Sequence, residues 1–251
     1  MVLDTAILGL TCPILAVGLA VLAEERGWGL FNNLDAPVWV AIVVSKILLD
    51  LAIYLQHVMF HAVPGLLRLH RIHHADLDFD ATTGLRFHPL EILISMGIKL
   101  GVVAALGPPA IAVLLFEVIL NATALFNYAN TNLPRPVDRI LRWIVVTPDM
   151  HRVQHSVDPR ETNSNFGFNL PWWDRLLGTY VAQPAQGHTE MVIGIEQFRT
   201  SRDLWLDRML IQPLRSPANG GVLDARSHQV QSSPVSTEQI KLGKDQGYQR
   251  H

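Results

Sequence analysis

Residues 57–74 read HVMFHAVPGLLRLHRIHH and hold five histidines at the end of a long apolar stretch. His57 and His61 are four residues apart, so on a helix both imidazoles lie on one face, one turn apart. His70 has the same relation to either His73 or His74. Neutral imidazole is the commonest metal ligand in proteins near neutral pH. The stretch therefore predicts a metal site at the end of a helix.

A third group of histidines extends this candidate site. His151 and His155 repeat the spacing of four residues. The chain has one cysteine, Cys12, so thiolate zinc sites and iron–sulfur clusters are excluded and any metal is held by nitrogen and oxygen. Such donors suit iron, zinc, copper or nickel. The histidines outnumber the ligands that one ion needs, which indicates two ions.

The composition is typical of a membrane protein. Hydrophobic residues make up 49% of the chain and charged residues 17%, whereas a soluble domain has about 25% charged residues. Four apolar runs approach the length that crosses a bilayer, namely Thr5–Ala23, Pro37–Gln56, Ile92–Leu106 and Ala110–Phe126. We predict an all-α integral membrane bundle of about four transmembrane helices with a histidine-rich helical cap. The net charge of -2 and the lack of a basic cluster argue against nucleic-acid binding.

The predicted topology places the histidines on one side of the membrane. Four crossings return both termini to that side, together with Arg68, Arg71, Arg86 and all basic residues from Arg135 onward. The positive-inside rule then assigns this side, with the termini and the histidines, to the cytoplasm.

Three regions are predicted along the chain. Residues 1–36 form the first transmembrane helix and a short loop; a cleaved signal peptide is the poorer reading, because no positive charge precedes the apolar run. Residues 37–200 form the histidine-containing domain, in which Val137–Val146 is a candidate amphipathic helix on the membrane surface. Residues 216–251 are polar and contain Gly, Ser, Gln and Pro, which predicts a disordered, non-catalytic tail.

Several longer motifs accompany the histidine boxes H-x₃-H and H-x₂-H-H. They are Phe87–Glu91, Asn132–Pro134, Met150–Val153, Glu161–Gly167 and Trp173–Tyr180. Together, from about Asp50 to Phe198, they resemble the fatty acid hydroxylase (sterol desaturase) superfamily. The resemblance implies a membrane di-iron enzyme that hydroxylates, desaturates or demethylates a lipid such as a sterol or fatty acid with O₂. It implies that two iron ions are held by seven catalytic histidines: His57, His61, His70, His73, His74, His151 and His155.

Two positions depart from that family's pattern. Gln154 stands where the late box has a histidine, and Tyr128 replaces the histidine of a Phe-Asn-His-x-Asn motif at Phe126–Asn130. One reading is that substitute ligands or supporting groups take over. The other is that one metal position is weakened and activity is altered or lost. The candidate supporting or substitute residues are His88, Asp50, Asn127, Tyr128, Asn130 and Gln154.

The resemblance also implies partners. The lipid substrate enters from the bilayer, the region from Arg135 to Tyr180 closes over the metals, and an external ferredoxin, cytochrome or reductase supplies electrons. Three other readings stay open. A bis-histidine haem electron-transfer protein needs histidines facing each other at bilayer depth, whereas these lie at helix ends. A catalytically impaired relative would bind lipid or regulate, and a metal transporter would need ligands along the middle of a pore.

Overall fold

The computed structural model describes residues 15–215, which belong to one compact unit. Within this part the chain is helical and forms no β-strand, only an isolated bridge between Ser156 and Ile193. This confirms the predicted all-α class. The predicted tail at 216–251 and the beginning of the predicted first transmembrane helix lie outside the described residues.

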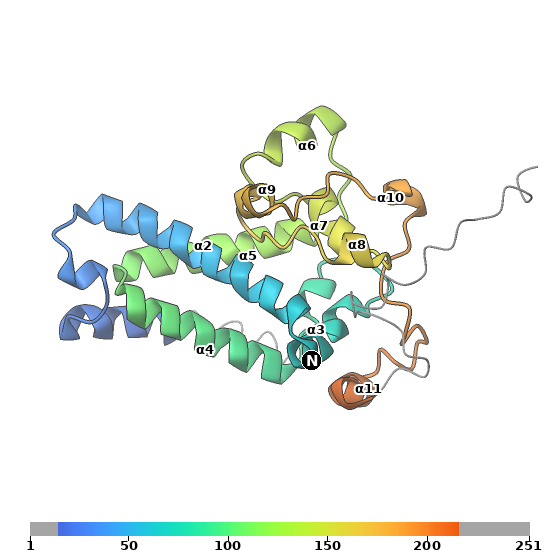
Figure 1. The fold of residues 1–251 in the computed structure, drawn as a ribbon, viewed down its shortest axis with the longest axis horizontal. Helices are drawn as coiled ribbons and strands as arrows, with labels where there is room; N and C mark the ends of the chain where they lie inside the picture. Colours follow the sequence, from blue (N-terminus) through green and yellow to red (C-terminus); the bar gives the residue numbers. More distant parts are fainter. Residues whose placement is uncertain (1–14, 216–251) are drawn as a thin grey trace, which may run out of the picture. The chain divides into compact units, whose positions relative to one another are not determined.

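Three long helices form the bundle and run side by side (Figure 1). They are α2 (Val38–Ala62), α4 (Pro89–Leu106) and α5 (Ala110–Asn127), and each is long and apolar enough to cross a membrane. Both α4 and α5 pack mainly against α2. The predictions for these three runs are confirmed, and the protein is an integral membrane protein.

The ends of these helices differ from the apolar runs. Helix α2 continues past Gln56 to Ala62, so His57 and His61 lie in its last two turns. Helix α4 begins at Pro89, and the ring of His88 caps it by accepting a hydrogen bond from the Leu90 amide at 3.1 Å. Proline suits this first helical position because its missing N–H would have no partner there.

Residues 15–26 form a further helix that packs on the bundle. Ala16 and Ala20 are fully buried in the apolar core, among Leu49 of α2, Val103 of α4 and Phe116 of α5. The small alanine side chains let this helix approach its neighbours closely, as is common between helices in membranes. That the helix crosses the whole bilayer stays a prediction, because its first part precedes the described residues.

Two glycines close the bundle at the end opposite the histidines. Gly29 and Gly107 both have positive φ, 88° and 56°. A Cβ on Gly107 would lie 2.1 Å from the Trp28 carbonyl oxygen, and one on Gly29 would lie 2.2 Å from the Gly107 nitrogen. The Leu30 amide donates to the Ala105 carbonyl beside them at 3.0 Å. Only glycine fits this backbone-to-backbone contact.

Short helices form a cap where α2 ends, α4 begins and α5 ends (Figure 1). The α-helices are α3 (Pro64–His74), α6 (Arg135–Leu141), α7 (Pro148–Gln154), α8 (Pro159–Thr162), α9 (Trp172–Leu177), α10 (Gly187–Glu190) and α11 (Leu206–Ile211). The 3₁₀ turns are η1 (Phe31–Asn33), η2 (Thr83–Leu85) and η3 (Gln212–Leu214).

The predicted helix Val137–Val146 is shorter than expected. Helix α6 ends at Leu141, and the chain then turns so that the Val146 amide donates to the Asn169 carbonyl at 3.0 Å. Val146 is fully buried, which draws the end of the predicted helix into the cap. Ile140, Trp143 and Ile144 stay exposed, so the apolar surface expected of this segment is present.

The segment after residue 200 packs against α3. The buried guanidinium of Arg71 donates to the carbonyl of Gln212 and, at 2.7 Å, to that of Arg215. The same guanidinium lies 5.0 Å from the centre of the Phe198 ring. Turn η3 and the residue after it therefore cover the helix that carries His70, His73 and His74.

We expect Gly107→Ala to destabilise the fold. An alanine at positive φ costs about 1–2 kcal/mol before its clash with the Trp28 carbonyl is counted. The melting temperature of the purified protein in detergent should fall clearly. The control is Gly101→Ala in α4, where a Cβ meets nothing within 4 Å and alanine is favoured over glycine in a helix by about 0.5–1 kcal/mol. Equal melting temperatures of the two variants would contradict this account of the bundle end.

Candidate metal centre

Seven buried histidines meet at the end of the bundle in two groups. The first histidine group is His57, His61, His70 and His74, and the second histidine group is His73, His151 and His155. Within each group, one ring nitrogen per residue lies within 4.8 Å of the others. The groups adjoin where the rings of His74 and His155 stack, with centroids 4.6 Å apart. The structure thus brings together all seven histidines of the sequence boxes.

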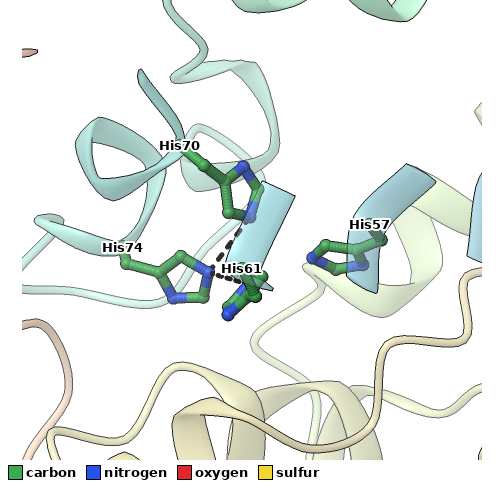
Figure 2. A group of neighbouring side chains, drawn as sticks. All are labelled: His57, His61, His70 and His74. Carbon is green, nitrogen blue, oxygen red and sulfur yellow. Dashed lines mark hydrogen bonds between the residues drawn. The ribbon is translucent and has the colours of Figure 1, made fainter. Parts of the chain in front are cut away.

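The first histidine group draws on two helices that meet at an angle. His57 and His61 come from the end of α2, while His70 and His74 come from α3, on the far side of the turn at Val63. The Nε2 atom of His74 lies 3.2 Å from the Nε2 atoms of both His61 and His70 (Figure 2).

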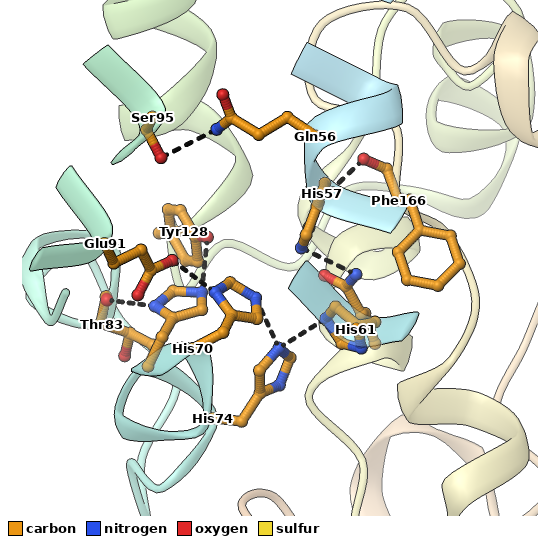
Figure 3. Close-up of polar contacts among 12 residues, drawn as sticks. Gln56, His57, His61, His70, His74, Thr83, Glu91, Ser95, Tyr128 and Phe166 are labelled. Atoms are coloured by element: carbon orange, nitrogen blue, oxygen red, sulfur yellow. Dashed lines mark hydrogen bonds and ion pairs between the residues drawn. The ribbon is translucent and has the colours of Figure 1, made fainter. Parts of the chain in front are cut away.

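Fixed acceptors determine which nitrogen of each ring carries the proton. The Nδ1 atom of His57 lies 2.9 Å from the Phe166 carbonyl (Figure 3). The Nδ1 atom of His73 lies 3.0 Å from the Thr83 carbonyl. A carbonyl oxygen only accepts, so both Nδ1 atoms donate and both Nε2 atoms keep a free lone pair. These lone pairs point into the centre, as in a ligating histidine whose other nitrogen is hydrogen-bonded.

A carboxylate orients a third ring. The Nδ1 atom of His70 lies 2.6 Å from an oxygen of Glu91, and both side chains are buried. Glu91 lies in the first turn of α4, three residues after the capping His88. A charged acceptor strengthens this hydrogen bond and raises the basicity of the opposite nitrogen.

The second histidine group contains ring nitrogens that the described part of the protein leaves without hydrogen bonds. Both nitrogens of His151 and of His155 have no partner there, although each residue is fully buried. A buried polar atom without a partner costs about 1–3 kcal/mol. Metal coordination removes this cost for one nitrogen of each ring, so the residues present fit a nitrogen-bound metal ion.

Burial keeps the cap imidazoles neutral. It lowers the pKa of His73, His74 and His155 far below the usual range, and neighbouring imidazoles lower it further. Burial, followed by the effect of His70, lowers the pKa of His151 to about 3. Only the neutral form of imidazole binds a metal, so these four side chains are ready to coordinate at physiological pH.

A cavity that opens to the side of the bundle reaches the histidines. It has a volume of about 570 Å³ and lies among α2, α4 and α5. His57, His70, His73 and Tyr128 line it at the cap end. The cavity therefore places a bound molecule against both histidine groups.

The comparisons with known proteins agree with this geometry. The family profile described as fatty acid hydroxylase matches residues 42–179, more than half of the chain. The chain belongs to the fatty acid hydroxylase family. All seven clustered histidines and the residues that orient them lie within the matched range.

Curated relatives share part of this chain. Ornithine lipid hydroxylase OlsE of Rhizobium tropici is 28% identical over 158 residues, which are 62% of this chain and 46% of that protein. Alkylglycerol monooxygenase of Xenopus tropicalis is 29% identical over 139 residues, 53% of this chain and 29% of that protein. The enzyme of the same name from Danio rerio is 25% identical over 193 residues, 74% and 40% of the two chains. The matches span less than half the length of these relatives. No solved structure matches.

Tyr128 and Gln154 depart from the family's histidine pattern, and each of them contacts a different histidine group. The Tyr128 hydroxyl lies 2.9 Å from Nε2 of His73, and the Gln154 amide nitrogen lies 3.1 Å from Nε2 of His57. Because both Nε2 atoms carry lone pairs, the hydroxyl and the amide are the donors. Each departure therefore places a hydrogen-bond donor on a nitrogen that a metal would use.

The tyrosine is accommodated and held neutral. Gly84 leaves the space for its ring, because a Cβ there would lie 2.5 Å from a ring carbon of Tyr128. Burial raises the pKa of Tyr128 above its usual value. A phenolate is thus disfavoured, whereas the Oε1 atom of Gln154 has no hydrogen-bond partner among residues 15–215 and is free to act as a ligand.

The other candidate supporting residues have partners away from the histidine groups. Asp50 accepts a hydrogen bond from the Trp173 indole at 2.7 Å, and Asn127 donates to the Phe168 carbonyl at 2.7 Å. Asn130 accepts from Arg152 at 2.8 Å. His88 caps α4, and its Nε2 atom lies 3.3 Å from the Leu210 carbonyl.

Sequence reasoning gave no role to residues that hold the site in place. Asp174 is fully buried and accepts from the backbone amides of Phe166 and Gly167, each at 2.8 Å, and from Thr179. It thereby fixes the loop whose carbonyl orients His57. Asp174 and Glu91 both lie in motifs that resemble the family, but a sequence motif does not show which groups its residues contact. Thr83 and Phe166 act through backbone carbonyls, for which side-chain chemistry gives no signal.

We expect Glu91→Ala to weaken metal binding by about 10–100-fold, because His70 loses the acceptor that orients its ring. Glu91→Gln keeps an acceptor oxygen, so its metal affinity should lie between that of Glu91→Ala and that of the parent. Anaerobic titration of the purified protein with Fe²⁺ measures the affinity.

The control for this titration is Asp207→Asn, whose side chain is 70% exposed in α11. It should bind iron like the parent. An unchanged affinity in Glu91→Ala would contradict the orienting role of this carboxylate.

Proposed function

We propose that this protein is a membrane-bound oxygenase that uses two iron ions and O₂ to hydroxylate a lipid. One observation carries the proposal: two adjoining groups of buried histidines lie at the end of a cavity between membrane-spanning helices. The names of the relatives support it, since they describe an ornithine lipid hydroxylase and an alkylglycerol monooxygenase.

In this proposal the first histidine group holds one iron ion and the second holds the other. Imidazole ligands suit iron, and when bound the ions supply the activation of O₂ that an unactivated C–H bond requires. One oxygen atom enters that C–H bond as a hydroxyl group. The other leaves as water, with electrons and protons from an external donor such as a ferredoxin, a cytochrome or a reductase.

The residues of this chain position the substrate and exclude water. The cavity holds the lipid so that a segment of its chain lies beside His57, His70 and His73. Phe87 and Phe168 line the same end and keep it apolar. The hydrogen bonds to Glu91, Thr83 and Phe166 keep the rings from turning, so binding of the metals requires little rearrangement.

The arrangement favours metal ions over haem. Each of the seven imidazoles contacts at least one other. The ring centroids of neighbouring histidines lie about 5 Å apart, both within the groups and between them. A flat macrocycle would have to separate them. The ligand-bearing residues also lie at helix ends rather than along the middle of the bundle, which does not suit a transport pathway.

A specific observation supports a second candidate function. Tyr128 and Gln154 place donors on nitrogens of His73 and His57. If iron does not displace these hydrogen bonds, the protein binds lipid in its cavity without oxidising it. Iron content distinguishes the two candidates.

Purified wild-type protein should contain iron and, with a chemical reductant, should transfer oxygen from isotope-labelled O₂ to co-purified or added lipid. His61→Ala removes a ligand of the first group and His155→Ala removes one of the second. Each variant should contain about one iron ion fewer than the wild type and should form little oxidised lipid. Elemental analysis and mass spectrometry of the lipid extract provide the readouts.

Tyr128→Phe provides the matched comparison, because it removes only the hydroxyl group that competes for His73. It should bind iron at least as tightly as the parent, and Tyr128→His and Gln154→His should raise the occupancy further. Negligible iron in the wild type and in all of these variants would rule out the di-iron proposal.

We further propose that the histidine groups face the cytoplasm, because most basic residues lie at the cap end of the bundle. A reporter inserted at Leu34, at the opposite end, and one at the C-terminus should then report opposite sides of the membrane. A C-terminal reporter found outside the cytoplasm would contradict this orientation.

A further inference from the structure

An ion pair lies in the wall of the cavity at a distance from the histidines. Nζ of Lys99 in α4 is 2.8 Å from a carboxylate oxygen of Glu117 in α5, and both residues line the cavity. Lys99 lies eight residues along its helix from Glu91, and Glu117 lies ten residues from Asn127. At a rise of about 1.5 Å per residue, the pair is about 12–15 Å from the histidine end.

This position is close to the middle of the membrane. The hydrocarbon core of a bilayer is about 30 Å thick, and ionisable groups at that depth are costly and typically functional. The side chains of Lys99 and Glu117 are only 12% and 3% exposed. A purely structural link between two helices does not need charges, because well-packed apolar residues in place of a buried ion pair are often as stable or more stable.

The pair keeps hydrogen-bonding capacity on the cavity side. A lysine ammonium group has three donors and a carboxylate has several acceptor sites. Among the described residues, the one hydrogen bond of the Lys99 ammonium is to Glu117. Nearer the histidines, Gln56 and Ser95 bond to each other across the cavity wall at 2.9 Å (Figure 3).

The wall between the two ends is otherwise mainly apolar. Ile53, Met96 and Leu120 line it. A molecule that fills this cavity therefore meets the histidines at one end and apolar side chains along its length. At the other end it meets the ammonium group of Lys99 and the carboxylate of Glu117.

We propose that Lys99 and Glu117 bind a hydroxyl group of the substrate. The substrate is then a neutral, hydroxylated lipid whose hydroxyl lies about 12–15 Å from the carbon that is oxidised. A hydroxyl both donates and accepts, so it matches a neutral pair of one cation and one anion. A charged head group would instead leave a net charge in the bilayer core, which is costly. The part of this inference that concerns the oxidised carbon rests on the proposed oxygenase function.

The lipid has a sideways route to this position. Helices α4 and α5 pack mainly against α2, and fewer contacts join them to each other. Two residues of the cavity lining, Asn121 and Leu125 of α5, are exposed on the surface of the bundle. A lipid can therefore enter from the bilayer, and hydrogen bonds to two charged groups offset the desolvation of its hydroxyl.

Photolabelling tests the orientation without any turnover. Two tetradecanol probes carry a diazirine, one beside the hydroxyl and one at the methyl end. The full chain is labelled in lipid nanodiscs, and the labelled peptides are mapped by mass spectrometry. The first probe should label α4 and α5 around Lys99 and Glu117, and the second should label residues near Phe87 and Tyr128. The reverse pattern, or the same pattern with both probes, would overturn the inference.

Substrate preference tests the residues themselves. The double variant Lys99→Met with Glu117→Gln keeps the side-chain sizes and removes both charges. The preference for tetradecanol over tetradecane should fall about tenfold, mainly through a higher KM, as expected for lost hydrogen bonds to charged groups. The control is Lys46→Met, which removes a charge from α2 outside the cavity lining and should leave the preference unchanged.

An equal loss on both substrates would make the pair structural and overturn the inference while the oxygenase proposal stands. If the iron-loaded parent oxidises neither substrate, the oxygenase proposal fails, and the labelling pattern alone decides where the hydroxyl binds.

Discussion

The direction of the imidazole protons is the constraint on which the site depends. His57, His70 and His73 each turn Nε2 toward the centre because Nδ1 bonds to an acceptor that cannot move. The acceptors come from the loop after α8, from the start of α4 and from η2. These segments meet only when the bundle and the cap are packed together. The fold thus prepares the ligands, and features distant from them, such as the contacts of Asp174 with the loop at 166–167, serve the same end.

The spacing of the histidines predicted a candidate metal site but not its division into two histidine groups. His73 and His74 are neighbours in the sequence, yet they belong to different groups. Successive residues of a helix point about 100° apart, so α3 directs one ring toward α7 and the other toward α2. The sequence left both partners open for His70, and the structure selects His74, four residues away. The placement of Tyr128 and Gln154 in opposite groups depends equally on tertiary packing.

Hydropathy located the three long helices because lipid-facing surfaces are apolar along their whole length. The apolar run of the second helix stops at Gln56, but the spacing of His57 and His61 extended the predicted helix over both histidines, and α2 indeed continues to Ala62. Hydropathy gave no role to residues 201–215, which pack on α3 through the carbonyls of Gln212 and Arg215. Backbone acceptors of this kind have no residue signature, and the same reason hid the roles of Thr83 and Phe166.

The distribution of the histidines along the chain has a consequence for biosynthesis. Five of the seven lie between residues 57 and 74, whereas His151, His155 and the Phe166 carbonyl follow 77 to 92 residues after His74. A growing chain therefore presents an incomplete set of imidazole donors while most of its cap is not yet synthesised. Copper and zinc bind such partial sites more tightly than ferrous iron does. If the protein takes up iron as proposed, loading depends on completing the cap before another ion is captured, so the order of synthesis would set a time window for metal selection.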